Sequence, residues 1–447
     1  MDFCKTYESH FIGKGMHSTA HARHYLSGLL GTQRRKNIET IHNDVSSSDY
    51  QGMEQFISSS PWKHEPLMAQ LGREASAMMS GAENTGLFID ETSFLKKGKA
   101  SVGVQRQWSG RAGKIDNCQV AVFACLGDGQ RMALADFRLF LPESWAEDEE
   151  RCTKAKIPQE QQRYLAKWEL ALEMVRQARQ NGQEFSWVGA DSLYGNNAKF
   201  LNALEDMGEH FVGDLHSTTK VWTNNPRLEE PGDHEAAPKG RPRKHPRLHG
   251  DNTARYLSVK EISAEEFEKS SQKISYRKGT KGRLTTRFMM REVWCWEKGW
   301  SQARKRLLLI SRDADDNFKW TLTNLTESED ASRHAWRQGQ RFWIEHAFHE
   351  AKSQLGMAQY QVRVWRGWHH HMALVCLAQL FSEKTRSTNQ EEHPLLSARD
   401  ITELLDYYLP RKRRSESEVL AQINERHRLR QLDIDRRKSQ TTGLPET

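Results

Sequence analysis

The sequence predicts a mixed α/β fold in which helices cover both faces of a sheet. Buried strands are predicted by short apolar runs, at residues 87–89, 119–126, 133–141 and 185–189. Amphipathic helices are predicted where apolar residues recur at helical spacing, before and between these runs. The 447 residues are too many for one compact core, so we expect two or three domains.

Residues 1–82 are predicted to form a helical N-terminal region. Apolar residues recur at helical spacing up to Leu30, and Gly31 marks the expected end of that helix. Further helices are expected over residues 34–43, 50–58 and 65–80. No group of catalytic residue types occurs in this region. It is interpreted as a DNA-binding region or, alternatively, as a helical cap over the next domain.

The first part of the α/β core is predicted over residues 83–215. Its first strand is expected to end at Asp90, and two further strands should follow it as a meander. A long amphipathic helix is expected over residues 159–181. The next strand leads directly to Asp191. The last expected elements of this part are a helix at residues 197–207 and a strand at residues 210–214.

Residues 216–331 are predicted to form a β-rich insertion. The segment begins with polar sequence rich in proline and glycine, too long for a plain loop, which favours a separate functional module. Strands are expected at residues 255–262, 288–296 and 306–311. The tryptophans here are interpreted as core, or alternatively one of them stacks on an unpaired base. They are Trp294, Trp296, Trp300 and Trp320.

Helical patterns return in the last third of the chain. Residues 332–385 are predicted to be the second part of the core, with helices over residues 333–354 and 368–381. Residues 386–447 are predicted to be a charged helical C-terminal region, which includes a helix over residues 398–409.

Three carboxylates are placed where metal chemistry could use them. Asp90 and Asp191 follow apolar strands, so they meet at one sheet edge if those strands are parallel neighbours. Glu345 lies among apolar residues of a helix, where an acid is costly unless a cation meets it. Oxygen ligands from separate elements suit Mg²⁺ or Mn²⁺. Two such ions about 4 Å apart stabilise both the attacking and the leaving oxygen of a phosphoryl displacement.

Each acid also has a structural alternative. An aspartate after a strand is often a turn former or a helix N-cap. Glu345 could pair with Arg341 or His349, which are one helical turn away. Helical geometry places Lys352 on the same face as Arg341 and Glu345, so two phosphate-binding cations would flank one metal-binding acid.

The charge distribution suits a polyanionic partner. The net charge is +7, and basic residues gather in local runs at 239–247, 277–291 and 411–414. In the first run, Arg241, Arg243 and Lys244 are predicted to bind DNA, because Gly240-Arg241-Pro242 is similar to the core of a minor-groove AT-hook. The alternative is a solvated basic loop.

Several classes of protein or site are disfavoured. No apolar stretch of about 18 residues occurs, and the N-terminus has no apolar core, so neither a membrane span nor a secretory signal is expected. The six cysteines form no close pair, which disfavours a zinc finger and fits a reducing, cytoplasmic setting. His369, His370 and His371 point in different directions on a helix, so packing or phosphate contact is expected rather than metal binding.

Three blocks of the sequence resemble bacterial insertion-sequence DDE transposases. They are FIDETSF at Phe88–Phe94, WVGADSLYG at Trp187–Gly195, and the helix with Arg341, Glu345 and Lys352. The third block is similar to the Y-R-E-K signature, although Gln338 stands where the tyrosine would be. With WRGWHHH (Trp365–His371) and GRPRK (Gly240–Lys244), the chain is most similar to insertion sequence family 701, and the resemblance spans Tyr25–Phe381.

The resemblance implies an RNase H-like core in which Asp90, Asp191 and Glu345 hold two Mg²⁺ ions, with Mn²⁺ as a substitute. It implies a transposase that binds the inverted-repeat ends of its element, cleaves them, and joins the 3′-hydroxyl ends to target DNA. A homodimer on DNA and a location in the bacterial cytoplasm, on the nucleoid when bound, are expected. The alternatives are a domesticated DDE nuclease and a non-catalytic DNA-binding regulator on the same scaffold.

Overall fold

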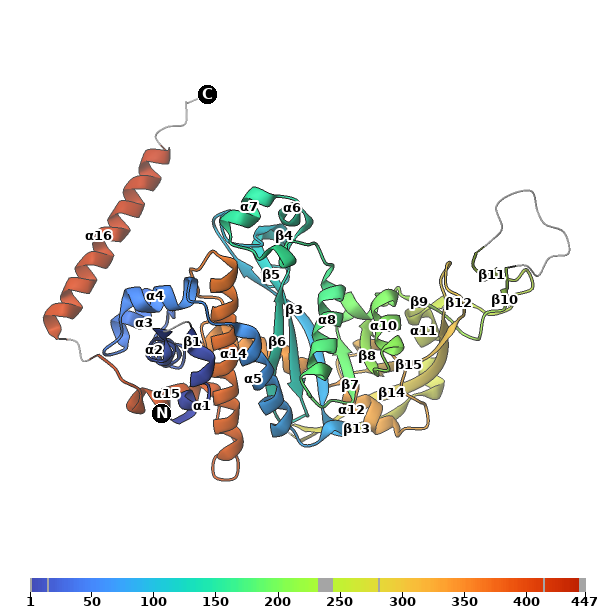
Figure 1. The fold of residues 1–447 in the computed structure, drawn as a ribbon. Helices are drawn as coiled ribbons and strands as arrows, with labels where there is room; N and C mark the ends of the chain where they lie inside the picture. The colour runs from blue at the N-terminus through green and yellow to red at the C-terminus, as the bar shows by residue number, and fades with distance from the viewer. Residues whose placement is uncertain (1, 14–15, 232–243, 280–281, 413–414, 442–447) are drawn as a thin grey trace.

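A single large mixed sheet organises the molecule (Figure 1). The structure is a computed structural model that describes residues 2–13, 16–231, 244–279, 282–412 and 415–441. Among these residues, the sheet has 12 strands in the order β12-β9-β14-β15-β16-β8-β7-β3-β5-β4, with β6 beside β5 and β13 beside β14. Helices pack on this sheet, so the predicted mixed α/β class is confirmed.

One half of the sheet contains the strands predicted for residues 83–215, in the order β6-β5-β3-β7-β8. β3, β5 and β6 form an antiparallel meander, β7 is parallel to β3, and β8 is parallel to β7. All four residues of β7 are buried, as expected of a strand covered on both faces. The bounds are β3 Gly86–Leu95, β5 Lys114–Gly127, β6 Met132–Leu139, β7 Trp187–Ala190 and β8 Phe211–Leu215.

Helices α8 (Lys167–Gln180) and α13 (Phe342–Gln354) approach this half from opposite faces. Glu91 of β3 pairs with Lys167 of α8 at 3.0 Å, whereas Asp90 faces Arg341 at the start of α13. Consecutive residues of a strand point to opposite faces, so the two helices cover different sides. The helix predicted from residue 159 begins eight residues later. Glu169 caps it by accepting from the backbone N–H of Ala166 at 2.8 Å, as in a capping box.

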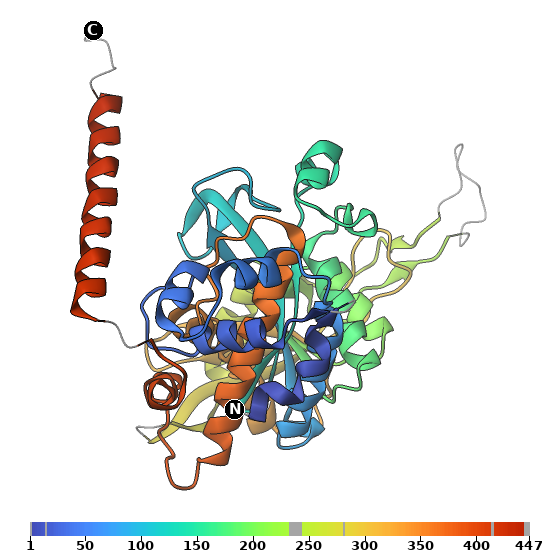
Figure 2. The same cartoon turned by 60° about the vertical axis from the view of Figure 1, so that its left-hand side comes forward.

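The N-terminal helices pack around α14 (Trp365–Thr388), as Figure 2 shows. His370 of α14 contacts the carbonyl oxygens of Ile57 and Trp62 at 2.9 Å and stacks on the Trp62 ring. His369, His370 and His371 are all buried, which confirms packing as their role. The helices are α1 Asp2–Thr6, α2 Thr19–Leu29, α3 Ile38–Asp44, α4 Tyr50–Ser58 and α5 His64–Met78, and the short strands β1 Ile12–Gly13 and β2 Met16–His17 pair among them.

The insertion extends the same sheet, because β16 pairs with β8. The strand predicted over residues 255–262 is wrong beyond Ser258, where α11 (Val259–Ser270) begins. The Ser258 hydroxyl accepts from the Glu261 backbone N–H, and the Glu261 carboxylate accepts from the Ser258 N–H in return. The strands are β9 Lys220–Trp222, β12 Tyr256–Ser258, β13 Gln272–Gly279, β14 Gly282–Cys295, β15 Arg304–Arg312 and β16 Phe318–Thr323, and β10 (Leu228–Glu229) pairs separately with β11 (Arg247–Leu248).

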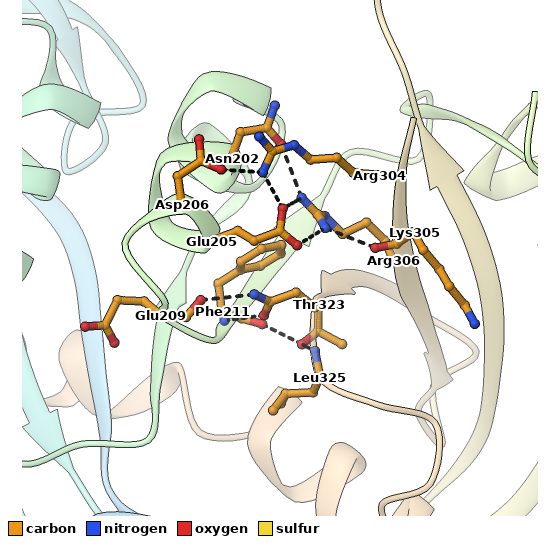
Figure 3. A network of polar contacts seen from close by, with 11 residues as sticks. Asn202, Glu205, Asp206, Glu209, Phe211, Arg304, Lys305, Arg306, Thr323 and Leu325 are labelled. Atoms are coloured by element: carbon orange, nitrogen blue, oxygen red, sulfur yellow. Dashed lines mark hydrogen bonds and ion pairs between the residues drawn. The ribbon is translucent and has the colours of Figure 1, made fainter. Parts of the chain in front are cut away.

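A polar network joins the insertion to the core (Figure 3). The Arg306 side chain of β15 is 1% exposed and donates to both oxygens of Glu205 at 2.6 and 2.8 Å. Glu205 lies on α10 (Ala198–Asp206) and also accepts from Arg304, which pairs with Asp206 at 2.8 Å. We call Glu205, Asp206, Arg304 and Arg306 the junction network. It fixes the two halves of the sheet relative to each other.

The C-terminal third differs from the predicted helices in one place. The helix predicted over residues 333–354 is two helices, α12 (Ala331–Gln338) and α13, because the chain turns at Gly339-Gln340. After α15 (Ala398–Tyr408), helix α16 (Glu416–Thr441) projects away from the body (Figures 1 and 2). Within the described residues, no helix has the length and apolar character that crossing a membrane requires.

Candidate active site

The three predicted acids lie in one pocket of about 690 Å³ at the edge of the core strands. Asp90, Asp191 and Glu345 come from three separate segments of the chain, and the pocket brings them together. Lys352 of α13 and Arg111 of the β4–β5 turn line the same pocket. Acids and cations therefore share one solvent-accessible cavity.

The positions of the two aspartates follow from strand pairing. β7 runs parallel to β3 with Ala190 opposite Ile89, so the next residue in each strand, Asp191 and Asp90, lies at the same level. The expectation that the strand ends at Asp90 is wrong, because β3 continues to Leu95 and Asp90 pairs with Phe123 of β5. Asp191 directly follows β7, which ends at Ala190. It also caps the short helix α9 (Ser192–Gly195), with Oδ1 accepting from Leu193 N at 3.0 Å, so its structural alternative holds alongside its pocket position.

A close backbone contact fixes α9 on the sheet. A Cβ atom added at Gly195 would lie 1.9 Å from the Asp214 carbonyl oxygen of β8, so no larger residue fits there. This contact seats α9 directly on β8. It therefore sets the position of Asp191, which begins the helix, and brings Asp214 to the same edge of the sheet.

Arg341 connects the acids across the pocket. Its Nη2 lies 2.6 Å from Glu345 Oε1, its Nε 3.0 Å from Asp214 Oδ2, and its Nη1 3.5 Å from Asp90 Oδ2. The pairing of Glu345 with Arg341, one of its two structural alternatives, is thus present. The fork of Arg341 is occupied by carboxylates, whereas the sequence led us to expect a phosphate contact. The Glu345 side chain is 55% exposed, so it has room to change rotamer.

Burial and neighbouring acids outweigh the nearby cations at the two pocket aspartates. Burial and the nearby Asp191 carboxylate raise the pKa of Asp90 to about 8, although Arg341 opposes this. Burial and the Glu91 carboxylate raise the pKa of Asp191 to about 6. Both shifts have the sign produced by desolvation and like charge, so an added cation would favour the ionised forms.

The donor set fits a hard divalent cation, since it consists of carboxylate oxygens from separate elements. As the side chains stand, no three His, Cys, Asp or Glu residues within the described ranges are arranged to coordinate a metal. Arg341 holds Glu345 toward itself in this arrangement.

The predicted DNA-binding residues are placed differently from one another. Lys352 donates from Nζ to Thr92 Oγ1, and burial together with Arg111 lowers its pKa to about 8. No carboxylate of the described residues forms an ion pair with Lys352. Arg241 and Arg243 lie outside the described residues, and Lys244 is exposed without lining the pocket.

Gln338, at the tyrosine position of the signature, is buried away from the pocket. Its Nε2 donates to Thr321 Oγ1 at 2.9 Å, which ties α12 to β16. Its role in the described structure is therefore packing between the insertion and the helix that precedes α13.

Three residues at the pocket were not predicted from the sequence: Asp214, Trp108 and Arg111. Asp214 lies in β8, which is parallel to β7. The signal in the sequence was its place at the end of the strand predicted at residues 210–214, as Asp191 follows the strand before it. Trp108 lines the pocket from β4 (Gln105–Ser109), a strand that the sequence analysis did not predict. The signal for this strand was a turn with two glycines, Gly110–Gly113, between two segments in which polar and apolar residues alternate.

The fold and this site define an α/β protein with a carboxylate-lined pocket at the edge of a mixed sheet. Residues 13–283, more than half of the chain, match the DDE superfamily endonuclease family, and the chain belongs to that family. It is also 29% identical over 222 residues to the probable transposase for insertion sequence element IS701 of Microchaete diplosiphon. That match covers 49% of this chain and 54% of the relative, so the chain spans about half the length of this curated relative. The expected relationship to insertion sequence family 701 is confirmed.

Proposed function

We propose that this protein is a DNA transposase that cleaves DNA with Asp90, Asp191 and Glu345. The observation that carries the proposal is the pocket in which these acids lie together beside Arg111 and Lys352. Acids of raised pKa provide a cation site, and the two cations provide contacts for a DNA phosphate. Membership of an endonuclease family makes a phosphodiester the natural substrate.

The core is proposed to be RNase H-like. The supporting features are the strand order β6-β5-β3-β7-β8, the antiparallel meander of the first three strands, and the two parallel strands that follow. We propose the same division of the chain as the sequence suggested: residues 83–215 and 332–385 for the core, 216–331 for the insertion, and 1–82 and 386–447 for the helical ends.

The bound cations are proposed to be two Mg²⁺ ions, with Mn²⁺ as a substitute. Asp90 and Asp191 would hold them through carboxylate oxygens, with Glu345 joining after it leaves Arg341. When bound, such ions lower the pKa of a water molecule and stabilise negative charge on the phosphate. Lys352 and Arg111 grip the DNA backbone near the cleaved bond as positive charges. Arg341 keeps Asp90 and Asp214 oriented through its hydrogen bonds.

The transposase activity is proposed from the relative, whose name is that of a transposase. The protein would bind the inverted-repeat ends of its element, cleave them, and join the 3′-hydroxyl ends to target DNA as a homodimer on DNA. A non-catalytic regulator would have no need for three acids and two cations in one pocket. A domesticated nuclease would keep the cutting and lose the joining.

The test uses the full-length protein and a labelled duplex that contains the repeats flanking the gene. Incubation with Mg²⁺, followed by mapping of products on a sequencing gel, should give cuts at the repeat boundary and joined products with added plasmid. Cutting without joining would indicate the domesticated nuclease, and binding without cutting would indicate the regulator. Full cutting in excess EDTA would rule out the metal-dependent mechanism.

A further inference from the structure

The β4–β5 hairpin holds two large apolar side chains in water. Trp108 and Ile115 are each 59% exposed, and they lie directly opposite each other on the two strands. Opposite residues of an antiparallel pair share one face, so the two side chains form one apolar pair. All 14 tryptophans lie within the described residues, and Trp108 alone is classed as exposed. A lone exposed apolar residue is ordinary, whereas a tryptophan and an isoleucine side by side are not.

The pair stands at the candidate active site. Trp108 lines the same pocket as Asp90 and Glu345, and Arg111, in the turn of the hairpin, lines it as well. Within the described part of the chain, Arg111 forms no ion pair with a carboxylate. In Figure 1 the hairpin lies at the upper edge of the sheet, beside α6 (Glu143–Ala146) and α7 (Glu149–Lys154).

The hairpin is held in place by its own hydrogen bonds. The buried hydroxyls of Ser109 and Ser93 lie 2.7 Å apart and join β4 to β3. The backbone N–H groups of Ala112 and Gly113 donate to the Ser109 carbonyl at 3.0 and 2.9 Å and close the turn. The Gln107 side chain donates to the Cys118 carbonyl at 2.9 Å. The exposed pair is therefore presented on a fixed support.

From these observations we infer that Trp108, supported by Ile115, stacks on a DNA base beside the cleaved phosphodiester and separates it from its neighbour. The face of a base is flat and apolar, which suits an exposed tryptophan, and the adjacent phosphate suits Arg111. A base that is unstacked at this point leaves the backbone open to the pocket acids. The inference rests on the proposed function and adds a DNA contact to it.

The first test measures base unstacking without cleavage. Full-length protein is bound to the flanking-repeat duplex in Ca²⁺, which permits binding with little chemistry, and treated with permanganate, which oxidises unstacked thymines. Thymines placed next to the cleavage position should become reactive with wild-type protein and with Trp108→Phe, but not with Trp108→Ala. Tyr407→Ala is the matched control, because Tyr407 is an aromatic residue of α15 that is 89% exposed and does not line the pocket.

The second test measures cutting in Mg²⁺ on two versions of the duplex. On fully paired DNA, Trp108→Ala should cut about 5- to 150-fold more slowly than wild type, the range for the loss of one base–aromatic stack. On a duplex that is mismatched beside the cleavage position, the variant should regain most of the rate. Because permanganate reports stacking and the gel reports cutting, failure of the inference and failure of the proposed function give different results.

Three outcomes would overturn the inference. One is a wild-type complex without reactive thymines. A second is an equal loss of cutting by Trp108→Ala on paired and mismatched DNA, which would make Trp108 a general DNA contact. The third combines two results for Trp108→Ala: a particle mass below that of wild type by light scattering without DNA, and a permanganate pattern equal to that of wild type. These results would assign Trp108 and Ile115 to a contact between protein subunits.

Discussion

Two groups of carboxylates in this protein have opposite electrostatic surroundings. In the junction network, burial raises the pKa of Glu205, but hydrogen bonds from Arg306 and Arg304 outweigh burial and lower it below its usual value. In the pocket, burial and neighbouring acids raise the pKa of Asp90 and Asp191 despite the presence of Arg341. Both groups adjoin the same sheet, yet only at the junction do the cations outweigh the effect of burial on the carboxyl pKa.

The difference separates a structural ion network from a candidate binding site. At the junction, Glu205 accepts from both Arg304 and Arg306, and Arg304 also pairs with Asp206, so two arginines serve two acids. At the pocket, one guanidinium is shared among Asp90, Asp214 and Glu345, of which Asp214 also pairs with Lys319 at 3.2 Å, and Asp191 has no arginine of its own. Buried carboxylates of raised pKa are costly to folding and are typical of sites where a cation or a substrate stabilises their ionised form.

The largest effect should come from neutralising the pocket aspartates. Asp90→Asn and Asp191→Asn should each slow DNA cutting by about 10³-fold or more, because several kcal/mol of metal-dependent charge stabilisation is lost. Binding to the same DNA, measured by gel shift, should stay near the wild-type level. Glu205→Gln is the matched control and should cut normally. A pocket variant that cuts at the wild-type rate would remove that residue from the site.

The next effect concerns stability at the junction. Arg306→Met removes one of the two arginines that donate hydrogen bonds to the Glu205 carboxylate. Breaking a buried ion pair costs about 3–5 kcal/mol, and the free energy of unfolding should fall by an amount near the lower end of this range. The lower end applies because the Glu205 side chain is 32% exposed. Urea unfolding measures the change, which should be the same with and without Mg²⁺. Arg341→Met, in contrast, should be less destabilising when Mg²⁺ is present, and equal losses in both conditions would contradict this distinction.

The two groups should also respond to pH in opposite directions. A raised carboxyl pKa means that the folded state holds the proton more tightly than the unfolded state does. Metal-free protein should therefore lose stability as the pH rises from about 4. The contribution of Asp191 to this loss ends at about pH 6 and that of Asp90 at about pH 8. The lowered pKa of Glu205 contributes stability that is lost as pH falls below its usual value.

Thermal unfolding in EDTA and in Mg²⁺ measures this pH response. The increase in Tm that Mg²⁺ causes should be larger at pH 8 than at pH 6, because at the higher pH the ion compensates more ionised acid. Asp90→Asn should reduce the pH dependence of the increase. An increase that is independent of pH, or unchanged in Asp90→Asn, would exclude Asp90 as a ligand.

The smallest expected effect is that of a single phosphate contact. Lys352→Ala should reduce the slope of log K against log salt concentration by about one unit, similarly for repeat and random DNA. Lys154→Ala is the matched control, since Lys154 is 74% exposed and pairs with Glu150 of its own helix. Fluorescence anisotropy across a salt series gives the slopes. An unchanged slope for Lys352→Ala would leave Lys352 with only its hydrogen bond to Thr92.

Local sequence patterns predicted most elements of the core. They failed where a helix cap was overlooked and where a tertiary contact specifies the element. The length of the apolar runs and their alternation with polar residues placed the ends of β5, β6 and β7 to within a few residues. The exception is the start of β5, which lies earlier than predicted. The pattern after Ser258 suggested a strand, but a capping box with Glu261 begins a helix there. The extension of β3 beyond Asp90 was not visible in the sequence, because that part of the strand is specified by pairing with β5.

The sequence by itself determined the α/β class and the helical face that Glu345 shares with Lys352, and it indicated the three candidate acids, since these depend on residue type and short-range spacing. Only the tertiary structure decided that the acids share one pocket, that Arg341 bridges three carboxylates, and that Trp108 stands exposed beside them. Burial and ion pairing join residues that are far apart in the chain, such as Asp90 and Arg341. The charge balance and the pKa of each acid follow from those contacts, and no local pattern specifies them.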